Sequence, residues 1–403
     1  MNESKKHEVV IVGGGFAGIE TAKKLSKSND VQVTLISKNA YFEYYPALYK
    51  LVTGALAIEV CTPYDKIFPK GSGVEVVEGQ YQSYDKTQKV VTLVDGRTFL
   101  YDYLVLGLGS ETNYFNIPGI EQYAFSFKSA QEALALKGHF INLLQESKDV
   151  PSDDLVKRFH ITIVGGGPSG VELAGDITTY MRVMARRYHI DSSFITVDLI
   201  ESNSRVLAML PESVSKKAEA RLRRLKVNLY TNRRFQSQDF DEITASAMKM
   251  KGGTVIWTAG TKINDLFNTL SLDTRKRVDV KGDFTLPEDN RVFVVGDGAN
   301  MPGTGLAQGA ITHGAYVGSA ILEKISGKIP TPYKGKTMGY IVPIGHNWAV
   351  FSYKKITIAG FIPWIMRSFV DFRYFTTIVP LLYVFEVFRQ GAKYRREGVH
   401  FYD

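Results

Sequence analysis

A glycine-rich turn between an apolar strand and a helix occurs twice in this chain, and this repetition limits the possible folds more than any other feature. In the first copy, the strand Val9 to Val12 leads into Gly13 to Gly18, then into a helix that reaches Leu25. A second apolar strand, Val31 to Ile36, follows a polar turn. Strand, glycine turn, helix and strand within about 30 residues predict a βαβ unit with parallel strands.

The second copy has the same order of elements, with strands at Ile161 to Val164 and Thr196 to Ile200 and a helix from Val171. In such a turn the glycines permit a tight bend, close approach of backbone to a pyrophosphate, and close helix–strand packing. The phosphates lie at a helix N-terminus, where free N–H groups favour negative charge. We therefore predict an α/β protein with two Rossmann-like dinucleotide-binding domains. The turn residues are Gly13, Gly14, Gly15, Phe16, Ala17 and Gly18 in the first copy, and Gly165, Gly166, Gly167 and Gly170 in the second.

An acidic residue at the end of the second strand distinguishes the two sites. In the second copy Glu201 follows the strand directly, where a carboxylate accepts hydrogen bonds from ribose hydroxyls and repels a 2′-phosphate. This favours NADH over NADPH, although the nearby Arg205 weakens the preference. Glu201 lies 31 residues after Gly170, and we expect the basic stretch from Met181 to Ser193 to account for the excess over the usual spacing.

The first copy lacks this carboxylate. Ser37 stands at the strand end and Lys38 and Asn39 follow it, so we expect neutral side chains to hold the ribose there. Glu43 is a possible substitute.

Composition excludes several other kinds of chemistry. The only cysteine, Cys61, permits no internal disulfide, no redox-active pair and no Cys-rich metal site, so electrons must move through a bound cofactor. The net charge of +8 could attract anionic nucleotides or an anionic membrane, but no nucleic-acid motif accompanies it. The N-terminus lacks the apolar segment of a signal peptide and no apolar run is long enough to span a bilayer. We expect a protein of the reducing cytoplasm.

Further strands are expected along the chain. Val74 to Val94 has short alternating runs typical of an antiparallel excursion, and Tyr103 to Gly109 and Thr254 to Gly260 are candidates for buried strands. Arg291 to Asp297 is another strand, ending in Gly-Asp. Asp297 either returns to the cofactor bound by the first turn, where it would contact a flavin ribityl chain, or simply caps a helix.

Several segments, in the same order, resemble the type II NADH:quinone oxidoreductases, the single-subunit respiratory dehydrogenases that do not pump protons. The likeness covers residues 8 to about 325 and is looser beyond. The segments that carry it are Gly13 to Gly18, Thr34 to Gly54, Leu106 to Asn113 with Ile117 to Gly119, Gly165 to Glu172, Trp257 to Gly260, Gly296-Asp297 and Ala307-Gln308.

The resemblance implies one non-covalent FAD at the first turn and NADH as the substrate at the second. Glu172 matches an acidic residue between nicotinamide and flavin that handles a proton, and its simpler interpretation is a first-turn acid that complements the helix dipole. Arg367 aligns loosely with a lysine facing the flavin pyrimidine edge. The further implied FAD contacts are Gly109, Asp297, Ala307 and Gln308, and the further NADH contacts are Ala259 and Gly260.

One departure concerns the acceptor. After Ala307-Gln308 the family has two glutamines before a glycine, lining the quinone path, whereas this chain has Thr312-His313. The implied quinone contacts are therefore Gln308, Thr312 and His313. His313 could donate to a quinone oxygen or could equally be a packed histidine.

The C-terminal region differs in composition from the rest. Phe361 to Phe388 is rich in large apolar and aromatic residues, and Arg389, Lys393, Arg395 and Arg396 follow. Apolar side chains beside a basic cluster are typical of an interfacial anchor on an anionic membrane, and a dimer interface or packing on the flavin domain is the alternative. The family combines anchoring with homodimer formation, and delivery of a lipid-soluble quinone requires access from the bilayer.

We thus predict a two-dinucleotide-binding flavoprotein on the cytoplasmic face of the cell membrane, passing electrons from NADH through FAD to a quinone. The expected domains are 1–115 with 285–330 for FAD, 116–284 for NADH, and 331–403 for membrane attachment and dimerisation. The altered Thr312-His313 pair keeps two alternatives open. One is a soluble NAD(P)H-dependent reductase of an electron-carrier protein, and the other is a flavin-bound signalling protein with slow turnover.

Overall fold

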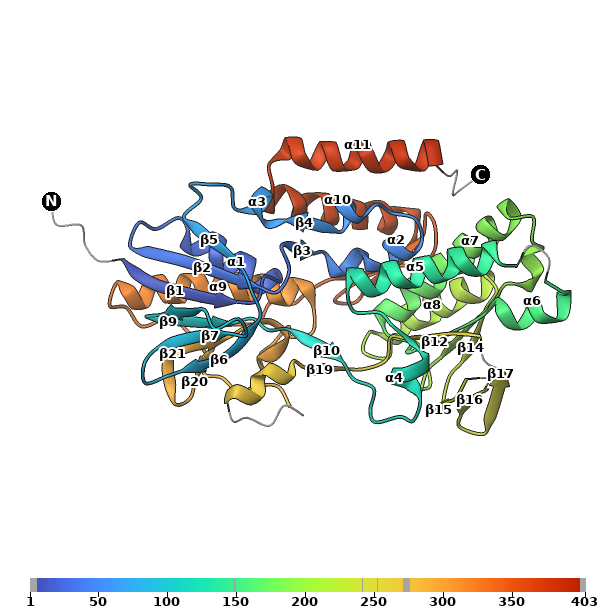
Figure 1. Ribbon diagram of the computed structural model, residues 1–403, viewed down its shortest axis with the longest axis horizontal. Helices are drawn as coiled ribbons and strands as arrows, with labels where there is room; N and C mark the ends of the chain where they lie inside the picture. Colours follow the sequence, from blue (N-terminus) through green and yellow to red (C-terminus); the bar gives the residue numbers. More distant parts are fainter. Residues whose placement is uncertain (1–5, 148–149, 241, 252, 271–275, 399–403) are drawn as a thin grey trace. The chain divides into compact units, whose positions relative to one another are not determined.

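The chain forms two compact units in a computed structural model that describes residues 6–147, 150–240, 242–251, 253–270 and 276–398 (Figure 1). Unit 1 comprises Met1–Glu43, Cys61–Glu111 and Thr261–Met338. Unit 2 comprises Tyr44–Val60, Thr112–Gly260 and Gly339–Asp403.

These units differ from the expected domains chiefly in three segments. Residues 261–284 join unit 1, where the Tyr81 hydroxyl lies 3.0 Å from the Thr269 hydroxyl and Val278 N–H donates to the Gly298 carbonyl. Residues 44–60 join unit 2, as does the chain from Gly339 onward. Neither transfer carries a sequence signal, because each depends on packing between segments far apart in the chain.

Unit 1 is built on a six-stranded sheet in the order β20-β21-β9-β1-β2-β5, in which only the β20–β21 pair is antiparallel. The apolar run from Val9 to Val12 is buried completely, as expected for a central parallel strand covered on both faces. The strand bounds are β1 (His7–Val12), β2 (Val31–Ser37), β5 (Val74–Glu78), β9 (Tyr103–Leu106), β20 (Thr285–Leu286) and β21 (Asp289–Val294).

The expected antiparallel excursion is only partly correct. Its first segment, β5, pairs parallel with β2 and forms the sheet edge. The remainder forms an antiparallel sheet of β6 (Tyr81–Asp85), β7 (Val90–Leu93) and β8 (Thr98–Leu100). Short alternating runs do not reveal which neighbour a strand will pair with, because pairing depends on packing against residues distant in the chain.

Two helices of unit 1, α1 (Phe16–Leu25) and α9 (Ala307–Ile325), pack closely against each other. A methyl group on Gly314 would overlap the Ala17 carbonyl, and one on Gly318 would lie 2.6 Å from Lys24 Cβ. The Thr21 hydroxyl also lies 3.1 Å from the Gly314 carbonyl oxygen. Glycines on α9 thus allow it to hold the helix that follows the first glycine turn.

Unit 2 contains a five-stranded parallel sheet in the order β11-β18-β12-β13-β14. Its strands are β11 (Phe125–Ser126), β12 (His160–Val164), β13 (Thr196–Ile200), β14 (Val227–Tyr230) and β18 (Thr254–Trp257). The helix α7 (Pro168–Arg187) runs for 20 residues and the short η3 (Ser192–Phe194) follows it. Together they account for the long spacing between Gly170 and Glu201, as the sequence predicted.

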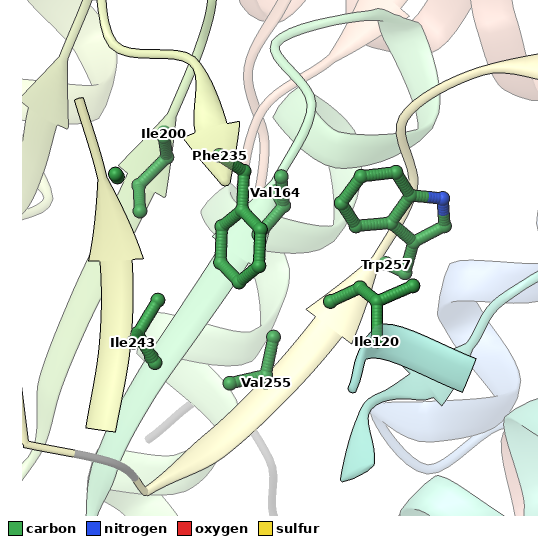
Figure 2. Close-up of a cluster of buried hydrophobic side chains, with 8 residues drawn as sticks. Ile120, Val164, Ile200, Phe235, Ile243, Val255 and Trp257 are labelled. Carbon is green, nitrogen blue, oxygen red and sulfur yellow. The ribbon is translucent and has the colours of Figure 1, made fainter. Parts of the chain in front are cut away.

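An apolar cluster lies between this sheet and the hairpin sheet of β15 (Phe235–Gln238), β16 (Glu242–Ala245) and β17 (Met248–Lys251). Figure 2 shows the side chains, which come from both sheets and from α4 (Ile120–Tyr123). Phe235 and Trp257 meet edge to face, with ring centroids 5.8 Å apart. The cluster comprises Ile120, Val164, Ile200, Phe235, Ile243, Ala245, Val255 and Trp257.

The C-terminal part of unit 2 consists of a three-stranded antiparallel sheet and two helices. The elements are β22 (Tyr340–Pro343), β23 (Ala349–Tyr353), β24 (Ile356–Gly360), α10 (Phe361–Ile378) and α11 (Leu381–Gly398). The two helices, red in Figure 1, run side by side, and Phe372 contacts the rings of Phe385 and Phe388 across them. Within the described residues, no helix combines the length and apolar character needed to cross a membrane.

The remaining elements connect these parts. In unit 1 they are β3 (Tyr41–Glu43), β4 (Cys61–Pro63), α3 (Tyr64–Ile67), β19 (Thr261–Ile263), η4 (Asp265–Leu270) and η5 (Gly296–Gly298), with β10 (Ser110–Thr112) at the unit boundary. In unit 2 they are η1 (Tyr45–Ala47), α2 (Leu48–Val52), η2 (Ala57–Glu59), α5 (Ala130–Gln145), α6 (Ser152–Arg158) and α8 (Glu212–Arg224).

Candidate functional site

The first glycine turn lies at the carboxyl end of β1, as the sequence predicts. Gly13 has φ of +109°, and a side chain there would overlap the carbonyl of Gly107 at the end of the neighbouring β9, so only glycine suits this position. Gly15 is the N-cap of α1 with no side-chain cap, and the space beside it is open. The first N–H groups of α1 are thus available to an anionic ligand.

Asp297 lies at the same edge of the unit 1 sheet. Its carboxylate accepts a hydrogen bond from the Ser110 hydroxyl at 2.6 Å and one from the Gly305 N–H at 3.2 Å. Gly109, just before Ser110, has open space beside it. The open space beside Gly15 and Gly109, the uncapped α1 and the edge carboxylate of Asp297 suit a dinucleotide such as FAD.

Ser37 is buried at the end of β2, and Lys38 is exposed. The Ser37 hydroxyl lies 3.2 Å from the hydroxyl of Tyr64, a residue that sequence reasoning missed. Glu43 is also buried, and Asn39 donates to it at 3.5 Å.

In unit 2 the second glycine turn is held by Glu201. One carboxylate oxygen accepts the Gly166 N–H at 2.6 Å, and the other accepts the backbone and side-chain N–H groups of Asn203. Gly167 is an uncapped N-cap with open space beside it, so the N–H groups of α7 are available to a ligand. Ala259, after β18, lies against Gly165, and Gly260 has φ of +74°.

Arg205 is committed to the protein. Its guanidinium donates to the carbonyls of Leu207, Ala208 and Leu210 and to the Ser215 hydroxyl. The Arg205 side chain therefore stabilises the loop after Glu201. It would have to break these hydrogen bonds to bind a 2′-phosphate. Arg205 therefore opposes a preference for NADH less than the sequence indicated.

Glu172 lies in the second turn of α7, because the helix begins at Pro168. The helix dipole acts mainly within the first turn, so it gives little reason for a carboxyl there. The side chain is buried, and among the described residues no group hydrogen-bonds its carboxyl. Burial raises the pKa of Glu172 to about 8, partly opposed by Arg367 and supported by Asp176.

Arg367, on α10, lies in the same electrostatic cluster of unit 2. Its guanidinium is 2.9 Å from Asp371 Oδ1 and donates to the Pro46 carbonyl at 2.8 Å. Asp371 also accepts from the Tyr44 hydroxyl at 2.7 Å and from Lys50 at 3.4 Å. Sequence reasoning found Glu172 and Arg367 but not Tyr44, Lys50 or Asp371. These three carry no motif, and Asp371 lies more than 300 positions from the other two.

The helix α9 carries the residues predicted to meet the quinone. Gln308 is exposed in its first turn, and the Thr312 hydroxyl contacts the Gly309 carbonyl and the Tyr333 hydroxyl, each at 2.9 Å. His313 is fully buried, with Nε2 2.9 Å from the Pro302 carbonyl and its ring against Phe284. Burial lowers the pKa of His313. This geometry favours the packed histidine over the quinone donor.

Comparison with known proteins places these features in a family. Residues 7–314 match the family model of the pyridine nucleotide-disulphide oxidoreductases. Over 384 residues the chain is 30% identical to a type II NADH:quinone oxidoreductase of Mycobacterium tuberculosis, covering 90% of this chain and 83% of that protein. The chain belongs to the type II NADH:quinone oxidoreductases.

Solved structures agree with the fold of this family. NDH2 from Plasmodium falciparum, solved with NADH, superimposes with a TM-score of 0.87 at 18% identity, covering 99% of this chain and all of that one. The sulfide:quinone oxidoreductase of Aquifex aeolicus gives 0.77 at 18% identity, covering 93% and 91%. Like its family, this type II oxidoreductase is FAD-dependent. Its single cysteine leaves no thiol pair for disulfide chemistry.

Proposed function

We propose that this chain oxidises NADH bound at the unit 2 turn and reduces a membrane quinone, with FAD held at the unit 1 turn. Bound FAD supplies hydride acceptance and two-electron transfer, which no side chain of the protein can perform. The observation that carries the proposal is the presence of two helix N-termini without side-chain caps behind glycine turns, together with the buried acid Glu172, whose carboxyl receives no hydrogen bond from the part of the chain that the structure describes.

Each unit contributes a defined task. The N–H groups at the starts of α1 and α7 bind the two pyrophosphates. Glu201 fixes the NADH turn and presents negative charge where NADPH would carry its extra phosphate. Glu172, whose pKa is about 8, holds a proton at neutral pH and can release or recover it during turnover.

The acceptor site is proposed on α9. Ala307 and Gln308 lie in its first turn, where Gln308 is exposed, and Thr312 offers a hydroxyl one turn further along. We leave His313 out of the quinone contacts because its ring is buried and one nitrogen is already bonded. Arg367 remains the proposed cation for the reduced flavin, since its charge is held in place by Asp371.

We also propose that α10 and α11 attach the protein to the cytoplasmic face of the membrane and take part in a homodimer. Both helices expose large apolar side chains, which we call the C-terminal apolar surface. Its residues are Phe361, Ile362, Ile365, Phe369, Val370, Leu381, Leu382, Phe385 and Phe388. Arg373, Arg389 and Lys393 are exposed on the same helices and suit anionic lipid, while the side chains of Arg395 and Arg396 lie outside the described residues.

Steady-state NADH oxidation by the purified protein tests the proposal, with menaquinone and ubiquinone analogues as acceptors and NADPH as the alternative donor. We expect rapid quinone-dependent turnover with NADH and a yellow protein that releases FAD on denaturation. Turnover only with an electron-carrier protein would support the reductase alternative. Slow oxidation with every acceptor would support the signalling alternative, and a colourless protein would exclude all three.

A further inference from the structure

The two glycine turns hold equivalent peptide groups in place with different hydrogen-bond donors. In unit 2 the Leu207 N–H donates to the Gly166 carbonyl at 2.7 Å. In unit 1 the equivalent carbonyl, that of Gly14, accepts the Tyr64 hydroxyl, also at 2.7 Å. The positions correspond because the N–H groups of Gly13 and Gly165 each donate, at 2.8 Å, to a carbonyl near the end of the neighbouring strand, that of Ile36 in β2 or of Ile200 in β13.

We infer that Tyr64 is a positioning residue for the FAD pyrophosphate: by holding the Gly14 carbonyl, its hydroxyl turns the Gly15 N–H toward the ligand. In a planar trans peptide the carbonyl and the N–H of the next residue point in opposite directions. Fixing one therefore aims the other. This inference rests on the proposed assignment of FAD to the unit 1 turn.

The surroundings of Tyr64 support this role. The side chain is buried, and burial raises its pKa, so the hydroxyl keeps its proton at physiological pH. Because that proton is donated to Gly14, the Ser37 hydroxyl at 3.2 Å must donate to the Tyr64 oxygen, which gives a chain from Ser37 through Tyr64 to the turn. Successive hydrogen bonds of this kind strengthen one another.

The identity of Gly14 fits the same arrangement. A methyl group at position 14 would overlap the Tyr64 hydroxyl, whereas the ligand side of the turn, beside Gly15, is open. The side chain of Tyr64 thus occupies the face of the turn opposite the ligand. The chain lacks a carboxylate at Ser37, and Tyr64 from α3 reaches the turn in its place.

The test is FAD release from diluted holoenzyme, measured as the rise in flavin fluorescence, for wild type and Tyr64→Phe. Loss of one buried hydrogen bond predicts about a three- to tenfold increase in the FAD dissociation constant. Tyr81→Phe is the matched control, because Tyr81 is a buried tyrosine of unit 1 whose hydroxyl lies 3.0 Å from the Thr269 hydroxyl, away from the turn. Its FAD affinity should match the wild type. Ser37→Ala should have a smaller effect than Tyr64→Phe.

Unchanged FAD affinity in Tyr64→Phe would overturn the inference, as would an equal loss in Tyr81→Phe, which would indicate general loosening of unit 1. Far-UV circular dichroism at saturating FAD checks folding, and a Tyr64→Phe protein that excess FAD does not restore would also count against a role confined to the turn. Wild-type protein that binds no FAD would instead defeat the proposed function, so the two failures are distinguishable.

Discussion

The guanidinium of Arg367 pairs with the carboxylate of Asp371 at 2.9 Å, whereas the buried carboxyl of Glu172 accepts no hydrogen bond from it. Asp371 is in turn bonded by Tyr44 and Lys50, so it brings α10 together with the segment around α2. Because Arg367 is paired with Asp371, Glu172 remains a desolvated acid. This explains why burial outweighs the attraction of Arg367 in setting its pKa.

Replacing Glu172 with Gln should remove one ionisation from the pH dependence of kcat. In the wild type, activity that needs the protonated carboxyl should fall as pH rises through about 8, the pKa of Glu172. Glu172→Gln should lack that limb and be slower by about 100-fold if the group transfers a proton. The check is kcat from pH 6 to 10, with the exposed Glu212→Gln on α8 as the control. A wild-type limb that persists in Glu172→Gln would assign the titration to another group.

The same substitution should stabilise the fold in alkali. The pKa of Glu172 is raised from 4.5 to about 8, so its stabilising contribution is complete below the unfolded value and is lost as pH rises through the folded one. Thermal unfolding should therefore show Glu172→Gln melting above the wild type at pH 9 and near it at pH 5. Equal melting temperatures at pH 9 would show that ionised Glu172 is accommodated without cost.

Neutralising Asp371 should shift the titration of Glu172. In Asp371→Asn the charge of Arg367 is no longer balanced by Asp371 and acts on Glu172, so the alkaline limb of kcat should move to lower pH by about one unit. Tyr44→Phe is the matched control, since it removes a hydrogen bond to Asp371 and leaves the charge. A limb that moves equally in both variants would point to loosened packing instead of charge.

Glu201 should set the choice of nicotinamide cofactor. Because its carboxylate opposes a 2′-phosphate and Arg205 is committed to backbone carbonyls, kcat/KM should be about 100-fold lower with NADPH than with NADH. Arg205→Ala should raise KM for both cofactors by loosening the loop. A selective loss of NADPH use in this variant would show that Arg205 binds the phosphate after all.

Charged residues in the C-terminal apolar surface should weaken attachment to lipid. Leu382 is 84% exposed and Phe385 is 55% exposed, so Leu382→Glu with Phe385→Glu should lower partitioning into anionic vesicles by at least about 100-fold. Phe240→Glu, at a residue 82% exposed on the β15–β16 turn, is the control for a single exposed aromatic. Point variants are preferred to a truncated chain, because ending the chain at Lys355 would also remove β24 from its sheet. If the double variant floats with vesicles as the wild type does, the C-terminal apolar surface would be assigned to a protein partner instead of lipid.

A histidine remote from both turns should give unit 2 a pH-dependent stability. His160 Nε2 lies 2.8 Å from Asp198, and this hydrogen bond raises the pKa of the histidine. The stabilisation is present below the unfolded pKa of about 6.5 and is lost as pH rises through the folded value. His160→Gln should therefore reduce the melting temperature more at pH 6 than at pH 8. His139, whose pKa burial lowers, should show the opposite dependence.

The sequence predicted the parts of the fold that depend on local order. Strand, turn and helix follow one another within each βαβ unit, so β1, β2, β12 and β13 were predicted within a residue or two. Partners that meet only through tertiary packing could not be found this way. Tyr64 lies 50 residues from the turn it contacts, and Asp371 lies 327 residues from Tyr44. No motif marks either residue, because any helix, strand or loop that lies close enough could supply the hydroxyl or carboxylate for these hydrogen bonds.

The contact of α9 with α1 has a consequence for how the protein is made. Unit 1 needs residues from its first βαβ unit and from Thr261–Met338, and Gly314 and Gly318 rest directly against α1. During synthesis on the ribosome, the N-terminal segment therefore cannot pack against α9 until most of the chain has been made. We expect the Thr112–Gly260 segment of unit 2, which is continuous in the chain, to fold first, and cofactor binding by unit 1 to come late, after the nascent chain has passed residue 318.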